Sequence, residues 1–282
     1  MELNYKKMGD SPQHLVILHG MFGMLDNWQT LARQWSAHFS VWIIDLRNHG
    51  KSPHSLDFDY YAMSDDLLLF FNTHSITSAF VLGHSMGGKV AMQFAVEHSQ
   101  RVSRLIVADI APKNYPSGGH EEVFNALLNT NLAHIASRSD AESQLGVYLS
   151  DQATLQFILK NLSRNTDGTY QWKFHLDAIL LHYDDILANS LRQHDRFELP
   201  TLFIKGGESP RYIELPQDET LILQYFPNAQ IISIPKAGHW LHADKPAEFS
   251  EIVLHFLLPP NNAPYPDSPS TPLSNEKAES RS

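Results

Sequence analysis

AFVLGHSMGG, residues 79–88, joins a short apolar segment directly to the pattern Gly-x-Ser-x-Gly. Its first four residues are apolar and include β-branched and aromatic members, which is typical of a buried strand. From Met86 to His98 the apolar residues recur at helical spacing. Ser85 is therefore expected on a tight strand-to-helix turn, which the flanking glycines permit because they lack a Cβ atom. Such a turn lifts the hydroxyl above the sheet edge, so the pattern predicts a nucleophilic serine.

The same stretch also comes close to a phosphate-binding loop. Gly83, four further residues, Gly88 and Lys89 fit the pattern of that loop, but the next position must be Ser or Thr to ligate magnesium. This chain has Val90 there, and it lacks a convincing second strand with a metal-binding carboxylate. The sequence therefore favours a catalytic serine over a nucleotide site.

The composition is that of an ordinary soluble globule. With 282 residues, of which 43% are hydrophobic and 18% charged, the chain has ample material for one large α/β domain or two small ones. A net charge of -10 disfavours nucleic acid and anionic membrane surfaces as partners. No apolar run is long enough to span a bilayer.

The absence of cysteine excludes disulfides, a thiol nucleophile and a thiolate metal site. The segment from Met1 to Asp10 is polar and lacks the apolar core of a secretory signal. We therefore expect a cytoplasmic protein.

Strand-like apolar runs alternate with helical segments along most of the chain. The predicted strands are His14–Leu18, Ser40–Ile44, Ala79–Leu82, Arg104–Ala108, Thr201–Lys205 and Ala229–Ile234, and the predicted helices are 27–38, 60–74, 86–98 and 245–258. This alternation predicts an α/β fold with a mostly parallel central sheet and helices on both faces.

The alternation breaks between about Pro112 and Leu199, where the pattern is helix-like throughout. An all-helical insertion between two parallel strands predicts a cap over their carboxyl ends, where open α/β sheets bind ligands. We therefore expect a core of residues 1–111 and 200–258, with a helical cap at 112–199. Residues 259–282 are rich in Pro, Ser and Asn, so we expect a disordered tail there.

A serine hydroxyl becomes a good nucleophile when a neighbouring imidazole takes its proton, and that imidazole needs an acceptor behind it. We assign His239 as the base, because it lies in a short loop after the last predicted strand and Gly238 lets that loop turn inward. His242 is the alternative base. It leads into Asp244 and Pro246, which are typical of a helix N-cap and a first helical turn.

Two carboxylates are candidates to support the histidine. Asp109 ends the strand that follows the predicted serine helix, and Glu208 follows the strand 201–205, so both emerge at the same edge of the sheet. Ser209 stands where a Gly-x-x-Asp turn would place an acid, so that position carries no carboxylate. A carboxylate from the neighbouring strand can serve instead, because geometry matters and chain position does not. We favour Asp109 and keep Glu208 as the alternative.

An oxyanion hole requires two backbone N–H donors. The residue after the serine, Met86, supplies one, and the loop after the first long strand supplies the other. In that loop Gly20 lets the backbone turn, which directs the Met21 N–H inward, with Phe22 as the alternative donor. His19 is expected to order this loop through side-chain hydrogen bonds, and we give it no chemical role.

The segment 45–52 is dense in polar residues but makes a poor metal site. One aspartate and one histidine at this spacing are a weak ligand set, and the other histidines lack ligand spacing. We expect Arg47, Asp45 and the backbone to form a network that orders this loop, and we assign no metal and no cofactor. Trp240 and Phe22 are candidates to line an apolar pocket under the cap.

The chain thus carries separated motifs in a fixed order. They are His19-Gly20, Asp45-Leu46-Arg47-Asn48-His49-Gly50-Lys51-Ser52, Gly83-His84-Ser85-Met86-Gly87-Gly88-Lys89, Asp109-Ile110-Ala111-Pro112, Gly206-Gly207-Glu208-Ser209-Pro210 and Gly238-His239-Trp240. Together they resemble the α/β-hydrolase superfamily and, more narrowly, the YbfF-type esterases of bacteria. The resemblance runs from about residue 14 to 258.

This resemblance implies hydrolysis of carboxyl esters with short to medium acyl chains, with acyl-CoA thioesters as further substrates. It also implies a helical cap and an acid on the strand after the nucleophile, which matches Asp109, with Ser209 as a polar neighbour of the histidine. An amide residue is usual where this chain has Glu208, and this departure keeps Glu208 as a backup acid. The proline-rich tail is a second departure.

The sequence therefore predicts a serine hydrolase that acts on a small-molecule ester or thioester through an acyl-enzyme. Ser85, His239 and Asp109 are its predicted triad. The alternatives that share the fold are a C–C bond hydrolase and a cofactor-free haloperoxidase-like enzyme. From another class comes a non-catalytic binding protein on the same scaffold.

Overall fold

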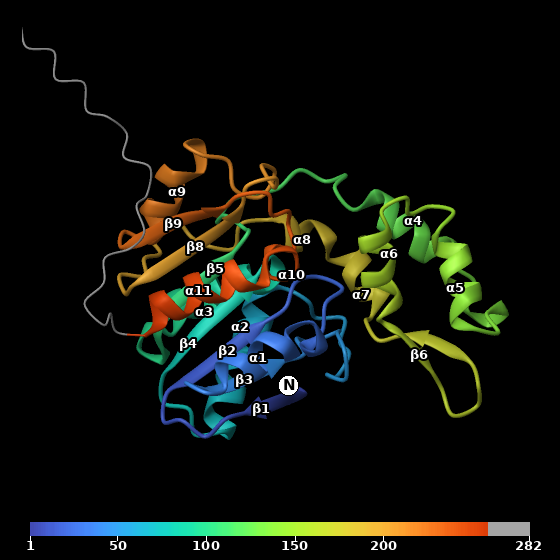
Figure 1. The fold of residues 1–282 in the computed structure, drawn as a ribbon, viewed down its shortest axis with the longest axis horizontal. Coiled ribbons are helices and arrows are strands. Elements are labelled where there is room, and N and C mark those ends of the chain that lie inside the picture. Colours follow the sequence, from blue (N-terminus) through green and yellow to red (C-terminus); the bar gives the residue numbers. More distant parts are fainter. Residues whose placement is uncertain (259–282) are drawn as a thin grey trace, which may run out of the picture.

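One central sheet of seven strands organises the structure, a computed structural model that describes residues 1–258 (Figure 1). The strands are β1 (Tyr5–Met8), β2 (His14–Leu18), β3 (Ser40–Ile44), β4 (Ala79–His84), β5 (Val102–Ala108), β8 (Thr201–Gly206) and β9 (Ala229–Ile234). Their order is β1-β3-β2-β4-β5-β8-β9, with β1 antiparallel to β3 and the other neighbouring pairs parallel. This order confirms the mostly parallel sheet that the sequence predicts.

Each predicted apolar run forms a strand, whereas β1 has no such signal in the sequence. Its residues read Tyr-Lys-Lys-Met, and the first three are exposed because β1 pairs only with β3 at the edge of the sheet. Lysines on an edge strand discourage pairing with a second chain. Edge strands of this kind escape a search for buried apolar runs.

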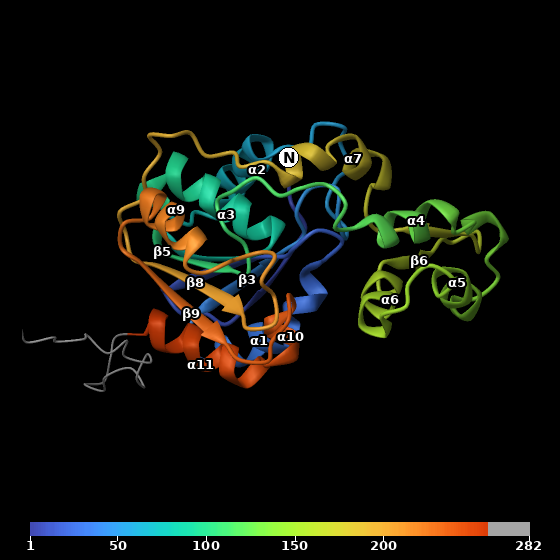
Figure 2. The ribbon, with the colours of Figure 1, turned by 90° about the horizontal axis from the view of Figure 1, so that it is seen from above.

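Helices cover both faces of the sheet (Figure 2). On one face lie α1 (Gln29–Trp35), α10 (Leu241–Asp244) and α11 (Pro246–Leu257), and on the other lie α2 (Tyr60–Thr73), α3 (Met86–Glu97) and α9 (Gln217–Tyr225). Along β2, Leu15 and Ile17 belong to the core shared with α1 and α11, and Val16 and Leu18 to the core shared with α2 and α3. Because both faces are buried, such strands are apolar without interruption.

The chain between β5 and β8 forms a lobe that projects to one side of the sheet (Figure 1). Its helices are α4 (Glu121–Asn129), α5 (Arg138–Leu145), α6 (Gln152–Leu159), α7 (Leu176–Leu181) and α8 (Tyr183–Leu187). Short 3-10 turns lie at Leu25–Trp28, Ser99–Arg101 and Leu132–His134. We refer to the lobe as the cap, and its boundaries at 112–199 stay a prediction.

The prediction of helix throughout this segment is wrong in one place. β6 (Leu162–Arg164) and β7 (Tyr170–Trp172) pair antiparallel as a hairpin. At its turn the Gly168 N–H donates to the Asn165 carbonyl at 3.0 Å, and Gly168 has a φ of 91°. An Asp-Gly pair favours such a turn because glycine accepts positive φ, and here this local preference decides the structure.

The segment 259–282, for which the sequence predicts disorder, lies outside the described residues. Within residues 1–258, no helix combines the length and the apolar content needed to cross a bilayer.

Candidate active site

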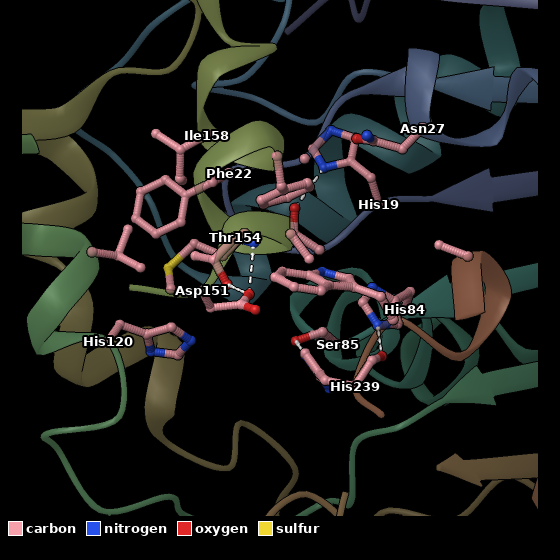
Figure 3. A pocket seen from close by; sticks show the side chains of 18 of the residues that line it. His19, Phe22, Asn27, His84, Ser85, His120, Asp151, Thr154, Ile158 and His239 are labelled. Carbon is pink, nitrogen blue, oxygen red and sulfur yellow. Dashed lines mark hydrogen bonds between the residues drawn. The ribbon is translucent and has the colours of Figure 1, made fainter. Parts of the chain in front are cut away.

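Ser85 occupies a sharp turn between β4 and α3, and its hydroxyl faces a cavity (Figure 3). Its backbone has φ 53° and ψ -120°, a combination that residues with a side chain rarely adopt. Two glycines make the turn possible. A Cβ on Gly83 would lie 2.1 Å from the Gly87 carbonyl oxygen, and a Cβ on Gly87 would lie 2.4 Å from the His19 carbonyl oxygen. The Ser85 N–H donates to the Ala108 carbonyl at 2.9 Å, which fixes the strained turn to β5.

The loop after β9 brings His239 to the serine (Figure 3). The Nε2 atom of His239 lies 3.0 Å from Ser85 Oγ, and its Nδ1 lies 2.8 Å from Asp109 Oδ2. The loop is fixed by the Gly238 N–H, which donates to the Asp244 carboxylate at 2.8 Å. The prediction that Asp244 caps the last helix is therefore wrong. α11 begins without a side-chain cap, because that carboxylate turns back to the histidine loop.

His242, the alternative base, does not contact the serine. Its ring is buried and stacks on Trp28, with centroids 4.2 Å apart and ring planes 11° apart. His242 therefore belongs to the packing between α10 and the core.

A further histidine, His84, holds the loop of His239. Its Nε2 lies 2.8 Å from the His239 carbonyl oxygen, so Nε2 carries the proton and donates. Burial lowers the pKa of His84 to about 3, so the ring is neutral. The sequence gives no signal for this role, because the residue before the serine in Gly-x-Ser-x-Gly is free in the pattern.

Asp109 directly follows β5 and is fully buried. Its Oδ1 accepts from the Gly206 N–H at 2.8 Å, and its Oδ2 accepts from the Ser209 hydroxyl as well as from His239. Burial raises the pKa of Asp109, and the hydrogen bonds from Ser209 and Gly206 oppose that rise because they stabilise the carboxylate. Glu208, the alternative acid, has an exposed side chain outside this network.

The imidazole of His239 is covered by the loop after β8. The ring of Tyr212 stacks on it, with centroids 3.6 Å apart and planes 12° apart. Tyr212 is held in turn by the Tyr115 hydroxyl, which donates to its carbonyl at 2.6 Å. Burial lowers the pKa of His239, and the Arg211 guanidinium lowers it further, so the ring is neutral near pH 7. No sequence pattern marks Tyr212 or Arg211, since their positions depend on the folded loop.

The candidate oxyanion donors are backbone N–H groups on two sides of Ser85. Met86 is the first residue of α3, and Met21 lies in the loop after β2. Within residues 1–258, neither N–H donates to an acceptor of the protein. Phe22, the alternative donor, has its N–H committed to His49 Nε2 at 3.2 Å. The geometry therefore favours Met21 over Phe22.

His19 orders the loop that carries Met21, as the sequence predicts. Its Nε2 accepts from the Leu46 N–H at 3.0 Å, and its Nδ1–H donates to the Gly20 carbonyl at 2.8 Å. Burial lowers the pKa of His19 to about 4, so one ring nitrogen donates while the other accepts.

The predicted network of Arg47, Asp45 and backbone divides into two parts. The Asp45 carboxylate accepts from the backbone N–H groups of Leu25 and Lys51, at 2.7 Å and 2.9 Å. Arg47 pairs instead with Asp66 on α2, at 2.6 Å. Asp45 therefore orders its own loop and ties it to the 3-10 turn at Leu25–Trp28, and Arg47 joins that loop to a helix.

A cavity of about 740 Å³ opens in front of Ser85, lined by both the core and the cap (Figure 3). Trp240 and Phe22 line it, as the sequence predicts, together with Phe157 and Ile158 of α6. The rings of Trp240 and Phe157 lie 5.1 Å apart, so the cap touches the residue next to His239.

A mostly parallel sheet with a serine on a strained turn, faced by a histidine from the loop after the last strand, defines an α/β hydrolase. Residues 13–246 match the family model for the alpha/beta hydrolase fold, and the chain belongs to that family. This match confirms the fold and the family resemblance predicted from the sequence.

The similar proteins match this chain over most of its length. It is 33% identical to Esterase YbfF of Escherichia coli over 261 residues, 91% of this chain and 99% of that protein. It is 37% identical over 250 residues to an sn-1-specific diacylglycerol lipase of Mus musculus, covering 86% of this chain and 80% of that protein. Among solved structures, a marine microorganism esterase superposes with a TM-score of 0.88 at 39% identity, covering 91% of this chain and 99% of that one.

Proposed function

We propose that this protein is a serine carboxylesterase, with Ser85 as nucleophile, His239 as general base and Asp109 as supporting acid. One observation carries the proposal: the contacts of 3.0 Å from Ser85 Oγ to His239 Nε2 and 2.8 Å from His239 Nδ1 to Asp109 Oδ2. Contacts of this length allow proton transfer. Similarity to proteins named as esterases and a lipase supports the same reaction class.

In the first half-reaction Ser85 Oγ attacks the ester carbonyl carbon while its proton passes to His239 Nε2. The carbonyl oxygen takes up the electron pair, and the N–H groups of Met21 and Met86 stabilise its negative charge. The tetrahedral intermediate then collapses, the bond to the alcohol oxygen breaks, and His239 returns the proton to the departing alkoxide. An acyl-enzyme on Ser85 remains.

In the second half-reaction a water molecule attacks the acyl-enzyme. His239 takes a proton from this water, and the same two N–H groups stabilise the second oxyanion. Collapse breaks the bond to Ser85 Oγ, His239 protonates that oxygen, and the carboxylic acid leaves. Asp109 keeps the His239 Nδ1 proton in place and stabilises the imidazolium in both steps.

The substrates that we propose are small-molecule esters with short to medium acyl chains, and thioesters of the same acyl groups. A thioester follows the identical steps, with a thiolate as the leaving group. We prefer this enzyme to a non-catalytic binding protein because Ser85 and His239 are both present and in contact.

Three variants and a series of acyl esters and acyl-CoA thioesters test the proposal. Ser85→Ala and Asp109→Asn are each expected to lower kcat by roughly a thousandfold or more. The first variant loses the nucleophile, and the second loses the carboxylate that holds the correct tautomer of His239. Glu208→Gln is the matched carboxylate control and is expected to keep near wild-type kcat. Wild-type activity in Ser85→Ala would overturn the mechanism, whereas a dead Glu208→Gln beside an active Asp109→Asn would overturn only the choice of acid.

A further inference from the structure

Two cavities of very different size meet at Ser85. The larger one has about 740 Å³, and a second one of about 30 Å³ also borders the serine. The second cavity, here called the inner cavity, is lined mainly by Met86, Ile110, Tyr60, Tyr115, Ile186 and Leu187. It is far smaller than the large cavity.

The two cavities differ in which catalytic groups they touch. His239 and its neighbour Trp240 line the large cavity but not the inner cavity. Met86, one of the two proposed oxyanion donors, lines the inner cavity, whereas Met21 lines both. Ser85 thus borders both cavities, whereas the base lines only the large one and the inner cavity presents mainly apolar surface.

This asymmetry fixes the direction in which an ester can bind productively. His239 must protonate the leaving oxygen, so the alcohol portion has to extend to the side where His239 lies. The oxyanion accepts hydrogen bonds from the two N–H donors. The acyl chain therefore extends in the direction that neither the alcohol portion nor the oxyanion takes.

We infer that the inner cavity binds the acyl group and the large cavity the alcohol group, so that the enzyme prefers esters of two- or three-carbon acids with bulky alcohols. This inference rests on the proposed function and deepens it.

The walls of the inner cavity are held in place by buried polar contacts. The Tyr60 hydroxyl donates to the Ile186 carbonyl at 2.6 Å. The Lys89 ammonium donates to the Leu187 carbonyl at 2.9 Å and to the Ala188 carbonyl at 2.6 Å. These bonds fix the chain segment that carries Ile186 and Leu187, so a longer acyl chain cannot easily push it outward.

Two isomeric esters test the direction of binding with the wild-type protein. Octyl acetate and ethyl octanoate have the same atoms and similar hydrophobicity, and they differ in which side of the carbonyl carries the long chain. We expect kcat/KM for octyl acetate to exceed that for ethyl octanoate by at least about tenfold, since even one methylene too many in an apolar pocket costs that much. Equal values, or the reverse order, would overturn the inference.

Two matched substitutions then test which cavity selects the acyl chain. Ile186→Ala enlarges the inner cavity and is expected to raise the ethyl octanoate to octyl acetate ratio by at least about tenfold. Ile135→Ala removes the same atoms from a side chain that is equally buried, 6% exposed like Ile186, but lines neither cavity, and is expected to leave that ratio unchanged. An equal change in both variants would contradict the assignment.

Failure of this inference is distinguishable from failure of the proposed function. If both isomers are hydrolysed equally well and Ser85→Ala is inactive, the esterase stands and the direction of binding is wrong. If wild-type protein hydrolyses neither isomer nor any ester or thioester of the series, the proposed function itself is wrong and the inference with it.

Discussion

At the scale of single residues, the chemistry of the candidate site depends on how its titratable groups are covered. Asp109 is buried and accepts three hydrogen bonds, from Gly206, Ser209 and His239. His239 is neutral near pH 7 because burial and the charge of Arg211 lower its pKa. A neutral imidazole in contact with the Ser85 hydroxyl is the state that accepts a proton.

The pH dependence of catalysis follows from this pKa shift. The base works only when deprotonated, so kcat/KM is expected to fall as pH drops through the pKa of His239. Because that pKa lies below its ordinary value of 6.5, the acid limb of the profile is expected below pH 6.5. Arg211→Gln removes a neighbouring positive charge, so it is expected to raise the pKa and move the limb upward by roughly half a pH unit.

Profiles of kcat/KM against pH for both proteins provide the measurement. Arg192→Gln is the control, since Arg192 is exposed on the cap and does not influence His239. A limb that moves downward in Arg211→Gln, or one that moves equally in both variants, would contradict this account.

Much of the candidate site could be predicted from the sequence at this scale, because its residues are marked by local sequence patterns. Ser85, His239 and Asp109 each follow a recognisable strand, and the carboxyl ends of parallel strands meet at one edge of a sheet. His84 and Tyr212 were not predictable, because their contacts with His239 depend on how separate loops pack.

At the scale of elements, the turn between β4 and α3 is the feature with the least freedom. Its geometry requires a residue without Cβ at Gly87, where an added atom would lie 2.4 Å from the His19 carbonyl oxygen. Backbone atoms surround the site, so no side chain can move aside.

Gly87→Ala is therefore expected to destabilise the fold by about 2 kcal/mol or more and to abolish most of the activity. The reason is that α3 must shift away from β2, which misplaces Ser85. Gly146→Ala is the control, because its helical backbone tolerates alanine and its nearest added contact is 3.1 Å. The free energy of unfolding from chemical denaturation and the kcat are to be measured for both variants. A Gly87→Ala protein as stable and active as Gly146→Ala would contradict this prediction.

Elements with strong periodicity were also the predictable ones. The apolar runs formed strands because burial on both faces leaves an unbroken signal. The hairpin of β6 and β7 was missed because its short strands are governed by the turn at Gly168, and β1 because an edge strand is largely exposed.

At the scale of the whole molecule, a buried lysine joins the catalytic helix to the cap. Lys89 on α3 donates to the carbonyls of Lys113, in the segment between β5 and α4, and of Leu187 and Ala188, at the end of α8. The ammonium also lies over the ring of Tyr115, 4.8 Å from its centroid. The position of the cap over the serine is therefore coupled to α3.

Lys89→Met is expected to lower the free energy of unfolding by about 2–4 kcal/mol, because three carbonyls lose their side-chain donor. Lys51→Met, which changes an exposed lysine, is expected to have almost no effect. Thermal and chemical unfolding of both variants provide the comparison. A loss of less than about 0.5 kcal/mol in Lys89→Met, the range of ordinary surface changes, would show that the three carbonyls do not depend on it.

The central claim is that Ser85 is a nucleophile activated by His239, and covalent labelling tests it most directly. A fluorophosphonate probe followed by peptide mapping is expected to find one adduct, on Ser85, in wild-type protein. Ser85→Ala is expected to remain unlabelled, and His239→Ala to react far more slowly. Full labelling of folded Ser85→Ala, or an adduct at another residue, would contradict the account.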